Sequence, residues 1–314
     1  MQFWALVQDA FRYSLDRKIF WVLLVISLLV ALAMFCIGFD GDRVSLMFGL
    51  WSSETDVFNV LSTLGRTRVV GLLIHGVLDL FLGWIGVTLV LIATAGIFPS
   101  MMESGGIEVL LGKPISRPRL FLYKYLAAMV FVALQAVLFV VLTFLVMGFR
   151  WHVWAPGYLL CIPLMVLLFS YVFCISVLVG VHVRSAVVAI LVSLVCWAAF
   201  AMIRQAPGFF DIFPEVQRHT RIHQAVRVLS WVPPKTADIP YLAARWAGAG
   251  TSVDAVPESA MQNAPYASRQ QMERSREWEE RQLRMSALKS IGSSLLFEAV
   301  VVMLAMRRFT RTDF

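Results

Sequence analysis

The stretch MMESGGIEVLLGKPISRPRLFLYK, residues 101–124, decides how the chain is interpreted. It is short, polar and basic, and a long apolar segment lies on each side of it. It runs from an acidic residue and Gly-Gly-Ile through Leu-Leu to Lys-Pro-Ile-Ser-Arg, and then restarts an aromatic-rich helix. Lysine and arginine gather in the cytoplasmic loops of membrane proteins. We therefore expect residues 99–124 to form a cytoplasmic loop between two membrane-spanning helices.

The composition of the whole chain favours a membrane protein. Of its 314 residues, 59% are hydrophobic and only 15% are charged, more apolar surface than a soluble domain of this size could bury. The net charge of +7 does not indicate nucleic-acid binding, because the basic residues flank the apolar segments. The four cysteines lie inside apolar segments without a C-x-x-C pair, so we expect neither a zinc site nor a redox motif.

Six apolar segments are long enough to cross a bilayer, which requires about 20 helical residues. They are residues 19–39, 69–98, 123–148, 157–181, 186–203 and 286–306. If the N-terminus lies in the cytoplasm, the termini and loops on the cytoplasmic side together carry eleven lysines and arginines. The short loops on the outer side then carry four. The positive-inside rule therefore predicts that both termini, including the tail 307–314, face the cytoplasm.

Residues 1–18 show an amphipathic pattern, with Phe3, Val7 and Phe11 on one helical face and Asp9 and Arg12 on the other. We expect a helix that lies in the membrane interface. The alternative is a frayed cytoplasmic extension of the first span. No small-residue cleavage site follows a short apolar core, so the segment does not resemble a signal peptide.

The connection 204–285 is long, and we expect it to be an extracytoplasmic and largely helical loop. Residues 240–248 are consistent with a short helix, whereas 248–267 are rich in Gly, Ser, Ala and Pro and suggest a flexible connection. From residue 268 the sequence is strongly helix-forming. Either one helix runs from there into the sixth span, or two helices meet at a bend near Ser286.

The loop 99–124 has the properties of a docking element. Gly105 and Gly106 permit a sharp bend, and Ile107, Leu110 and Leu111 are spaced as the apolar face of a short helix. Glu103 and Glu108 place negative charge near the start of that helix, where the helix dipole favours it. Pro114 ends it, and Arg117 and Lys124 can contact lipid phosphates or acidic partner residues. The alternative is a solvated loop without a partner.

The same loop does not bind nucleotide. Gly112 and Lys113 look like the end of a P-loop, but the partner glycine is missing because position 107 is isoleucine. Position 114 is proline, where a serine or threonine would have to reach magnesium. We therefore expect no ATPase site, no other enzyme activity and no cofactor on this chain.

The order of residues in this loop resembles the first cytoplasmic loop of ABC-2 type transporter permeases, the membrane subunits of a class of ABC exporters. An amphipathic entry helix, six spans and two cytoplasmic termini fit the same family. Its architecture implies an all-α polytopic membrane protein. Two features depart from the family: the long connection between spans five and six, and the very short second cytoplasmic loop at 182–185.

The resemblance implies the permease half of an exporter in the cytoplasmic (inner) membrane of a prokaryote. ATP and magnesium would be bound by separate ABC ATPase subunits, and a second permease copy or a related chain would complete the transporter within the membrane lipids. The residues expected to couple the loop to the ATPase are Glu103, Gly106, Ile107, Leu110, Leu111, Pro114, Ser116 and Arg117.

Three ionisable side chains lie deep in apolar sequence, His75, Asp79 and Glu298. Charged groups are costly in lipid and are often functional. His75 and Asp79 share a helical face at i, i+4 and could form a polar site on the transport path. The structural alternative, which we favour, is a hydrogen bond between helices.

Two further functions fit the same sequence. A gradient-driven carrier would use Asp79 and Glu298, although no inverted repeat supports it. A non-transporting scaffold would use the long outer loop to recruit an extracytoplasmic enzyme. Lipid, glycan, peptide or drug substrates are all compatible with the family.

Overall fold

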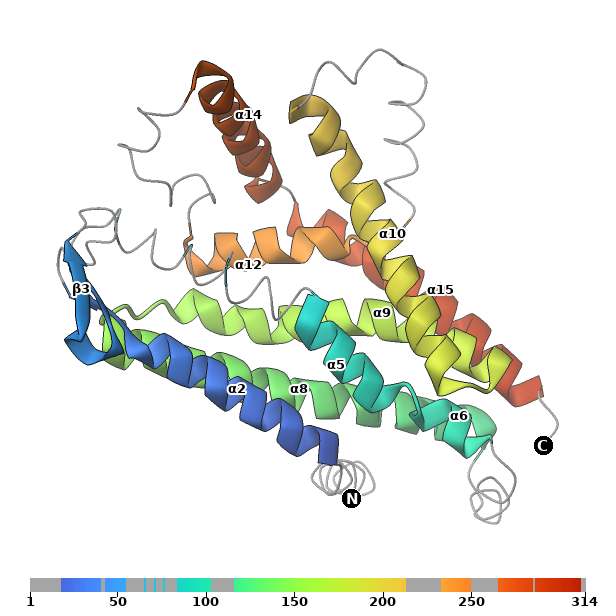
Figure 1. Cartoon of the computed structure of the whole chain (residues 1–314). Coiled ribbons are helices and arrows are strands. Elements are labelled where there is room, and N and C mark those ends of the chain that lie inside the picture. Colours follow the sequence, from blue (N-terminus) through green and yellow to red (C-terminus); the bar gives the residue numbers. More distant parts are fainter. Residues whose placement is uncertain are drawn as a thin grey trace.

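The computed structural model describes residues 18–40, 43–54, 84–102, 116–212, 233–249, 265–284 and 286–311, together with Gly65, Gly71 and Gly76. This part of the chain is a helical bundle with one small sheet (Figure 1). Five of its helices are long and apolar enough to cross a membrane. They are α2 (Lys18–Cys36), α8 (Arg117–Trp151), η4 (Pro156–Leu160) continued by α9 (Cys161–Val183), α10 (Ala186–Ile212) and α15 (Ala287–Arg311). The expected all-helical polytopic membrane protein is confirmed.

Apart from Gly71 and Gly76, the second expected span, 69–98, is described only in its last part. Helix α5 covers Trp84–Thr94, a turn follows at Ala95 and Gly96, and helix α6 covers Ile97–Met101. This turn therefore interrupts the helix before the end of the predicted span. The bend expected at Gly105 and Gly106 and the amphipathic helix expected at 1–18 lie outside the described residues.

Three helices extend beyond the predicted spans because contacts outside the apolar core hold their ends. Helix α8 begins at Arg117, six residues early, after an extended Ser116 and with Pro118 in its first turn, a position that suits proline. Helix α10 continues to Ile212, past Arg204, which binds Asp238. Helix α15 runs to Arg311 and therefore takes up most of the predicted tail.

The first span ends three residues earlier than predicted, because Ile37 begins a strand. Strands β1 (Ile37–Asp40), β2 (Arg43–Leu46) and β3 (Trp51–Glu54) form an antiparallel sheet in the order β1-β2-β3, with η1 (Met47–Gly49) between β2 and β3. Ile37 pairs with Leu46, and Arg43 pairs with Glu54. The Trp151 indole N–H donates to the Ile37 carbonyl at 2.8 Å, so the end of α8 fixes the chain where α2 ends.

Helix α9 lies at the centre of the bundle. It packs against α8, α10 and α15, while α2 packs on α8. Its side chains Phe169, Tyr171 and Phe173 are almost fully buried, as is Tyr158 of η4. In contrast, large apolar side chains of α2, α10 and α15 are exposed, as expected for helices that face lipid.

The segment after α10 folds back onto the bundle. Helix η6 (Thr236–Asp238) leads into α12 (Ile239–Ala247), which confirms the short helix expected at 240–248. Helix α12 packs on η4 and on α14 (Tyr266–Leu283), and Tyr241 meets Trp278 edge-on at 5.6 Å. Helix α14 ends at Leu283 and α15 begins at Ala287, so they are two helices, the second of the two alternatives.

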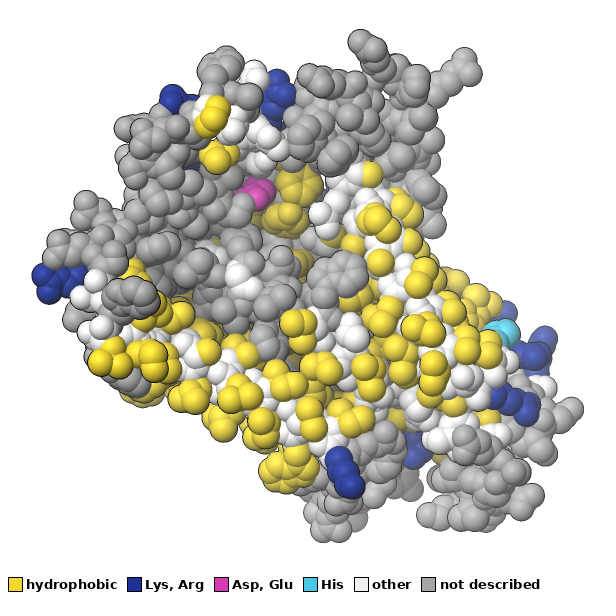
Figure 2. Space-filling model, viewed as in Figure 1, with side chains coloured by type: hydrophobic (Ala, Val, Ile, Leu, Met, Phe, Trp, Pro, Cys, Tyr) yellow, Lys and Arg dark blue, Asp and Glu magenta, His cyan; other side chains and the backbone are white. Residues whose placement is uncertain are grey.

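The surface of the bundle divides by residue type. Hydrophobic side chains cover the face over α2 and α10 (Figure 2). Some basic side chains lie over α14 and beside the strands, and others lie near the start of α2 and around the far end of α15 (Figure 2). We call this latter region the basic end. It holds Lys18, Arg117, Arg184, Arg308 and Arg311. The strands, η4 and α12 lie at the opposite end (Figure 1).

Candidate functional site

The candidate coupling loop connects α6 to α8, and the end of α6 and the start of α8 lie at the basic end (Figure 1). Six of its eight predicted residues lie outside the described part of the chain: Glu103, Gly106, Ile107, Leu110, Leu111 and Pro114. Ser116 and Arg117 are described. Ser116 has an extended backbone, and its carbonyl accepts the hydrogen bond from the Leu120 N–H at 3.1 Å. The loop therefore passes directly into the first turn of α8.

Four phenylalanines pack together beneath the two ends of the loop. We call them the aromatic foot: Phe98 of α6, Phe121 of α8, Phe173 of α9 and Phe309 of α15. Each is at most 1% exposed. The ring centroids of Phe98 and Phe121 are 4.9 Å apart, and those of Phe121 and Phe309 are 5.7 Å apart. Four helices thus meet where the loop begins and ends.

Polar and close-packing contacts support the aromatic foot. Arg117 Nη1 donates to the carbonyl of Thr310 at 3.2 Å, so the start of α8 neutralises the carbonyl-rich end of α15. A Cβ added to Gly180 of α9 would lie 3.4 Å from the Pro99 ring. The aromatic foot and these contacts therefore join α6, α8, α9 and α15 in one closely packed cluster.

Glu298 lies halfway along α15 and faces α8 and α9. The Tyr125 hydroxyl donates to its Oε1 at 2.7 Å. The Ser170 hydroxyl lies 2.9 Å from its Oε2 and 2.8 Å from the Leu167 carbonyl, and its single proton serves one acceptor at a time. Both carboxyl oxygens have hydroxyl neighbours, so Glu298 links three helices inside the bundle. His75 and Asp79 lie outside the described residues, and their predicted pairing stays a prediction.

A second polar network lies at the other end of α15 and was missed in the sequence. Arg204 of α10 forms two hydrogen bonds with the Asp238 carboxylate, at 2.7 and 3.0 Å, and the Ser290 hydroxyl donates to the same carboxylate at 2.8 Å. The Asp238 side chain is 2% exposed. The feature of the sequence that could have indicated this network is the pair of serines at 290 and 294. They are four residues apart and therefore lie on one face of the sixth span.

Lys235 joins this network from the segment before η6. Its backbone N–H donates to the Ser294 hydroxyl at 2.9 Å. Burial is the main cause that lowers the pKa of its ammonium group, and the nearby Arg204 lowers that pKa further, whereas Asp238 acts in the opposite direction. The segment 233–249 is therefore held to both α10 and α15 by buried polar groups.

The polar and aromatic contacts in the described part of the chain join its helices to one another. No group of three or more His, Cys, Asp or Glu side chains within it could hold a metal ion. Helix α15 contacts all three polar or aromatic clusters: Ser290 at one end, Glu298 in the middle and Phe309 at the basic end. It physically connects the coupling-loop region with the folded-back segment 233–249.

Comparison with protein families gives a match that covers almost the entire chain. The model of a family described as "ABC-2 family transporter protein" matches residues 4–314. No curated protein and no solved structure shows a significant match.

Proposed function

We propose, because the chain belongs to the ABC-2 family of transporter proteins, that it is the permease subunit of an ABC exporter driven by a separate ATPase. The observation that supports this proposal most strongly is the family match over residues 4–314. The matched range includes the loop and every described helix. As a multi-pass membrane permease of this family, the chain is expected to associate with an ABC ATPase subunit. The direction of transport and the separate ATPase belong to the proposal.

The geometry at the basic end supports a mechanical role for the loop 103–115. ATP and magnesium would be bound by the ATPase, and closure of the ATPase pair would displace the loop. The aromatic foot would pass that displacement to four helices, since Phe98, Phe121, Phe173 and Phe309 pack in one cluster. The helices would then shift between inward and outward access, a rigid-body switch driven by differential binding.

A complete transporter would contain two permease chains and two ATPase subunits in the cytoplasmic membrane of a prokaryote. The partner permease would be a second copy or a related chain, and membrane lipids would cover the rest of the apolar surface. The exposed apolar side chains of α2, α10 and α15 provide surface for both. Both termini and the basic end would face the cytoplasm, in keeping with the positive-inside rule.

The test is whether the loop holds the ATPase. Wild-type protein purified from its own cells in mild detergent is expected to retain an ABC ATPase subunit and ATPase activity. Leu110 and Leu111 are the expected apolar anchors, and replacing both by serine would remove on the order of 2–4 kcal/mol of burial. The double variant should insert normally, because no span is changed, and should lose the ATPase on purification.

A matched control replaces two leucines at the opposite end of the protein. Leu46 and Leu50 are 45% and 84% exposed, and the Leu46→Ser/Leu50→Ser variant should keep the ATPase. Replacing Arg119 at the membrane edge should also have little effect. If the Leu110/Leu111 variant retained a fully coupled ATPase, the loop would not be the main mechanical contact. Transport that a proton uncoupler stops but ATP depletion does not would instead support the carrier.

A further inference from the structure

One exposed face of α15 changes from apolar to basic along its length. Val301, Ala305 and Phe309 of this helix are buried in the bundle. The opposite face is exposed, and toward the basic end it consists of Leu296, Val300, Leu304, Arg307 and Arg311. Successive members of this set are three or four residues apart, so they form a single line along the helix. We call these five residues the exposed row.

The arginines of the exposed row lie in an area of high positive charge (Figure 2). Arg117 Nη1 donates to the Thr310 carbonyl at 3.2 Å, so the start of α8 brings a third guanidinium group to the end of α15. Helix α8 contains no acidic residue, and α15 contains Glu298 alone, in its middle. Guanidinium groups gathered in this way repel one another, and an anion that binds between them would relieve the repulsion.

The helix dipole of α8 adds to this positive potential. The first turn of α8 contains Arg117 and Arg119 and no acidic residue, although the N-terminal end of a helix already carries partial positive charge. This turn is therefore unfavourable for the protein alone and would be stabilised by an anion nearby.

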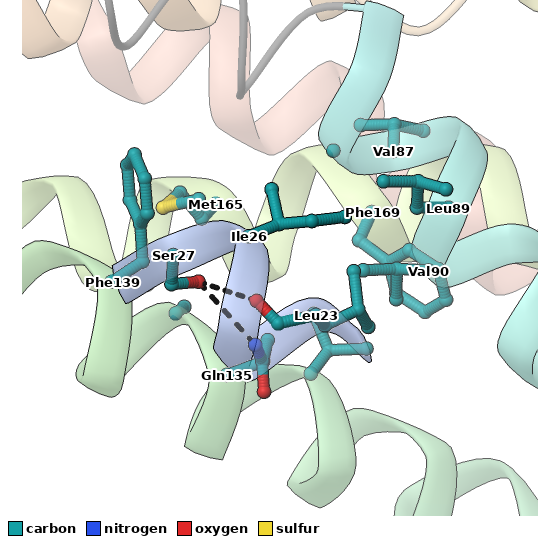
Figure 3. Close-up of a pocket in the computed structure, with 13 residues that line it drawn as sticks. Leu23, Ile26, Ser27, Val87, Leu89, Val90, Gln135, Phe139, Met165 and Phe169 are labelled. Atoms are coloured by element: carbon teal, nitrogen blue, oxygen red, sulfur yellow. Dashed lines mark hydrogen bonds between the residues drawn. The ribbon is translucent and has the colours of Figure 1, made fainter. Parts of the chain in front are cut away.

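The interior of the bundle does not offer an equivalent place for an anionic group. A cavity of about 60 Å³ lies between α2, α5, α8 and α9, and the side chains around it are mainly apolar (Figure 3). None of the described residues that line it is charged. An anion would have to leave water without a counter-charge there, which is strongly unfavourable. We therefore expect an anionic ligand on the surface, at the end of α15.

The exposed row also defines the apolar part of that ligand. Leu296 and Leu304 are about 12 Å apart along the helix axis, so the apolar half of the row can accompany an acyl chain, which a small soluble anion lacks. Arg307 and Arg311 are about 6 Å apart along the axis, so both guanidinium groups can reach one phosphate. Basic residues at the end of an apolar helix lie at the level of the lipid headgroups.

We propose that the exposed row of α15 binds an anionic phospholipid. Its phosphate lies between Arg307 and Arg311, and one acyl chain follows Leu304 and Val300. The site goes beyond the proposed exporter function, because lipid binding requires only the permease. It assigns an occupant to a face of α15 that the proposed function leaves open between lipid and a second permease.

The test compares two lipid probes that have the same acyl chains and different headgroups. Full-length permease in phosphatidylcholine nanodiscs, without ATPase, receives a trace of phosphatidylglycerol or of phosphatidylcholine that bears a diazirine on one acyl chain. After irradiation, chymotryptic digestion and mass spectrometry quantify the labelling of peptides from α15. The anionic probe should label them about five- to thirtyfold more than the zwitterionic probe, the factor that one or two arginines near the headgroups supply.

Variants locate the headgroup contact. Arg307→Gln/Arg311→Gln should lower the anionic-to-zwitterionic ratio at least about fivefold, whereas Arg307→Lys/Arg311→Lys keeps both charges and should retain most of it. The matched control is Arg276→Gln/Arg284→Gln, which removes the same charge from side chains of α14 that are 49% and 83% exposed. A second control, Lys18→Gln, removes an exposed charge at the basic end. Both controls should keep the wild-type ratio.

Four outcomes would overturn the site. Equal labelling by the two probes in the wild-type protein would show that α15 selects no headgroup. A ratio that persisted in Arg307→Gln/Arg311→Gln would place the headgroup contact elsewhere. An equal loss in Lys18→Gln would indicate a diffuse effect of charge. Labelling of α15 by neither probe would mean that protein, such as a second permease copy, covers the row.

The ATPase is the rival partner for these arginines. If Arg307→Gln/Arg311→Gln kept the lipid ratio but lost the ATPase on purification, the two arginines would be ATPase contacts and the lipid site would be wrong. The labelling experiment itself contains no ATPase, so its result does not depend on whether the protein is an exporter.

Discussion

Glu298 shows how a carboxyl group is accommodated inside a transmembrane helix. Its two oxygens lie within hydrogen-bond distance of the hydroxyls of Tyr125 and Ser170, from two other helices. Such polar contacts between helices are modest in energy, with a mean near 0.6 kcal/mol and a maximum near 1.7. The arrangement favours the structural interpretation of this acid, since both oxygens have hydroxyl neighbours.

Substitution of Glu298 can separate structure from ionisation. Glu298→Leu would remove the acceptor of the Tyr125 hydroxyl, whereas Ser170 could still donate to the Leu167 carbonyl. The variant should lower the free energy of unfolding by about 1–2 kcal/mol. Glu298→Gln keeps one acceptor oxygen and should lose less than about 1 kcal/mol. Thermal unfolding in detergent measures both changes.

Ser293→Ala serves as the control, because the Ser293 hydroxyl bonds to carbonyls of its own helix and its removal should change little. A Glu298→Gln protein that remained as stable as the wild type but failed to transport would contradict the structural role. It would indicate that Glu298 must ionise.

The ion pair between Arg204 and Asp238 should contribute far more than an exposed pair. Asp238 is 2% exposed and Arg204 is 19% exposed, so removing the carboxylate takes away both hydrogen bonds from Arg204 and the acceptor of the Ser290 hydroxyl inside the protein. We expect Asp238→Ala to lower the free energy of unfolding by about 2–4 kcal/mol. Tryptophan fluorescence during thermal unfolding provides the measurement.

Arg276 and Glu280 form the matched exposed pair, with side chains 49% and 44% exposed. Glu280→Ala should cost about 0–1 kcal/mol, because water screens the interaction. Equal losses in the two variants would mean that the buried network around Asp238 does not hold the segment 233–249 in place.

At the scale of elements, α12 is held to the bundle by a close backbone approach. Gly157 of η4 lies so near the Trp246 carbonyl and the Ala247 Cα that a Cβ could not fit without movement. Backbone cannot give way as a flexible side chain can. The glycine is therefore required by packing against α12 rather than by an unusual backbone angle.

Replacing this glycine tests the contact. Gly157→Ala should push α12 away from η4 and destabilise the protein by about 1–3 kcal/mol. Gly292 of α15 has open space around its Cβ position, so Gly292→Ala should be neutral or stabilise by up to about 1 kcal/mol. Thermal midpoints of the two variants give the comparison, and similar midpoints would show that α12 does not pack closely in solution.

At the scale of the whole molecule, the topology is open to a direct test. The free cysteines Cys36, Cys161, Cys174 and Cys196 are first replaced. A new cysteine at Ser53 or Ser259 should then react with a membrane-impermeant thiol reagent in intact cells. One at Ser104 or Thr312 should react only after the membrane is opened. Labelling of Ser104 from outside would exclude docking of the loop to a cytoplasmic ATPase.

The sequence by itself determined the class of the protein and most of its membrane helices. In lipid, the backbone hydrogen-bonding groups of a long apolar segment bounded by basic residues can be satisfied only if the segment is a helix. Each backbone N–H then has its partner within the same segment. The order of residues around Gly106 and Leu110 then indicated the family that the comparison confirms. These features are local in the sequence, so they can be recognised without the tertiary structure.

Only the tertiary structure decided where helices end and which polar groups meet. The chain changes from helix to strand at Ile37 because strand Arg43–Leu46 pairs there and Trp151 donates a hydrogen bond to the Ile37 carbonyl. Helix α10 continues past the predicted span, where its Arg204 binds Asp238. Asp238 meets Arg204 across 34 residues, and Glu298 meets Tyr125 across 173. Hydropathy carries no information on such pairs, since the energy of each depends on a contact that exists only after the helices pack.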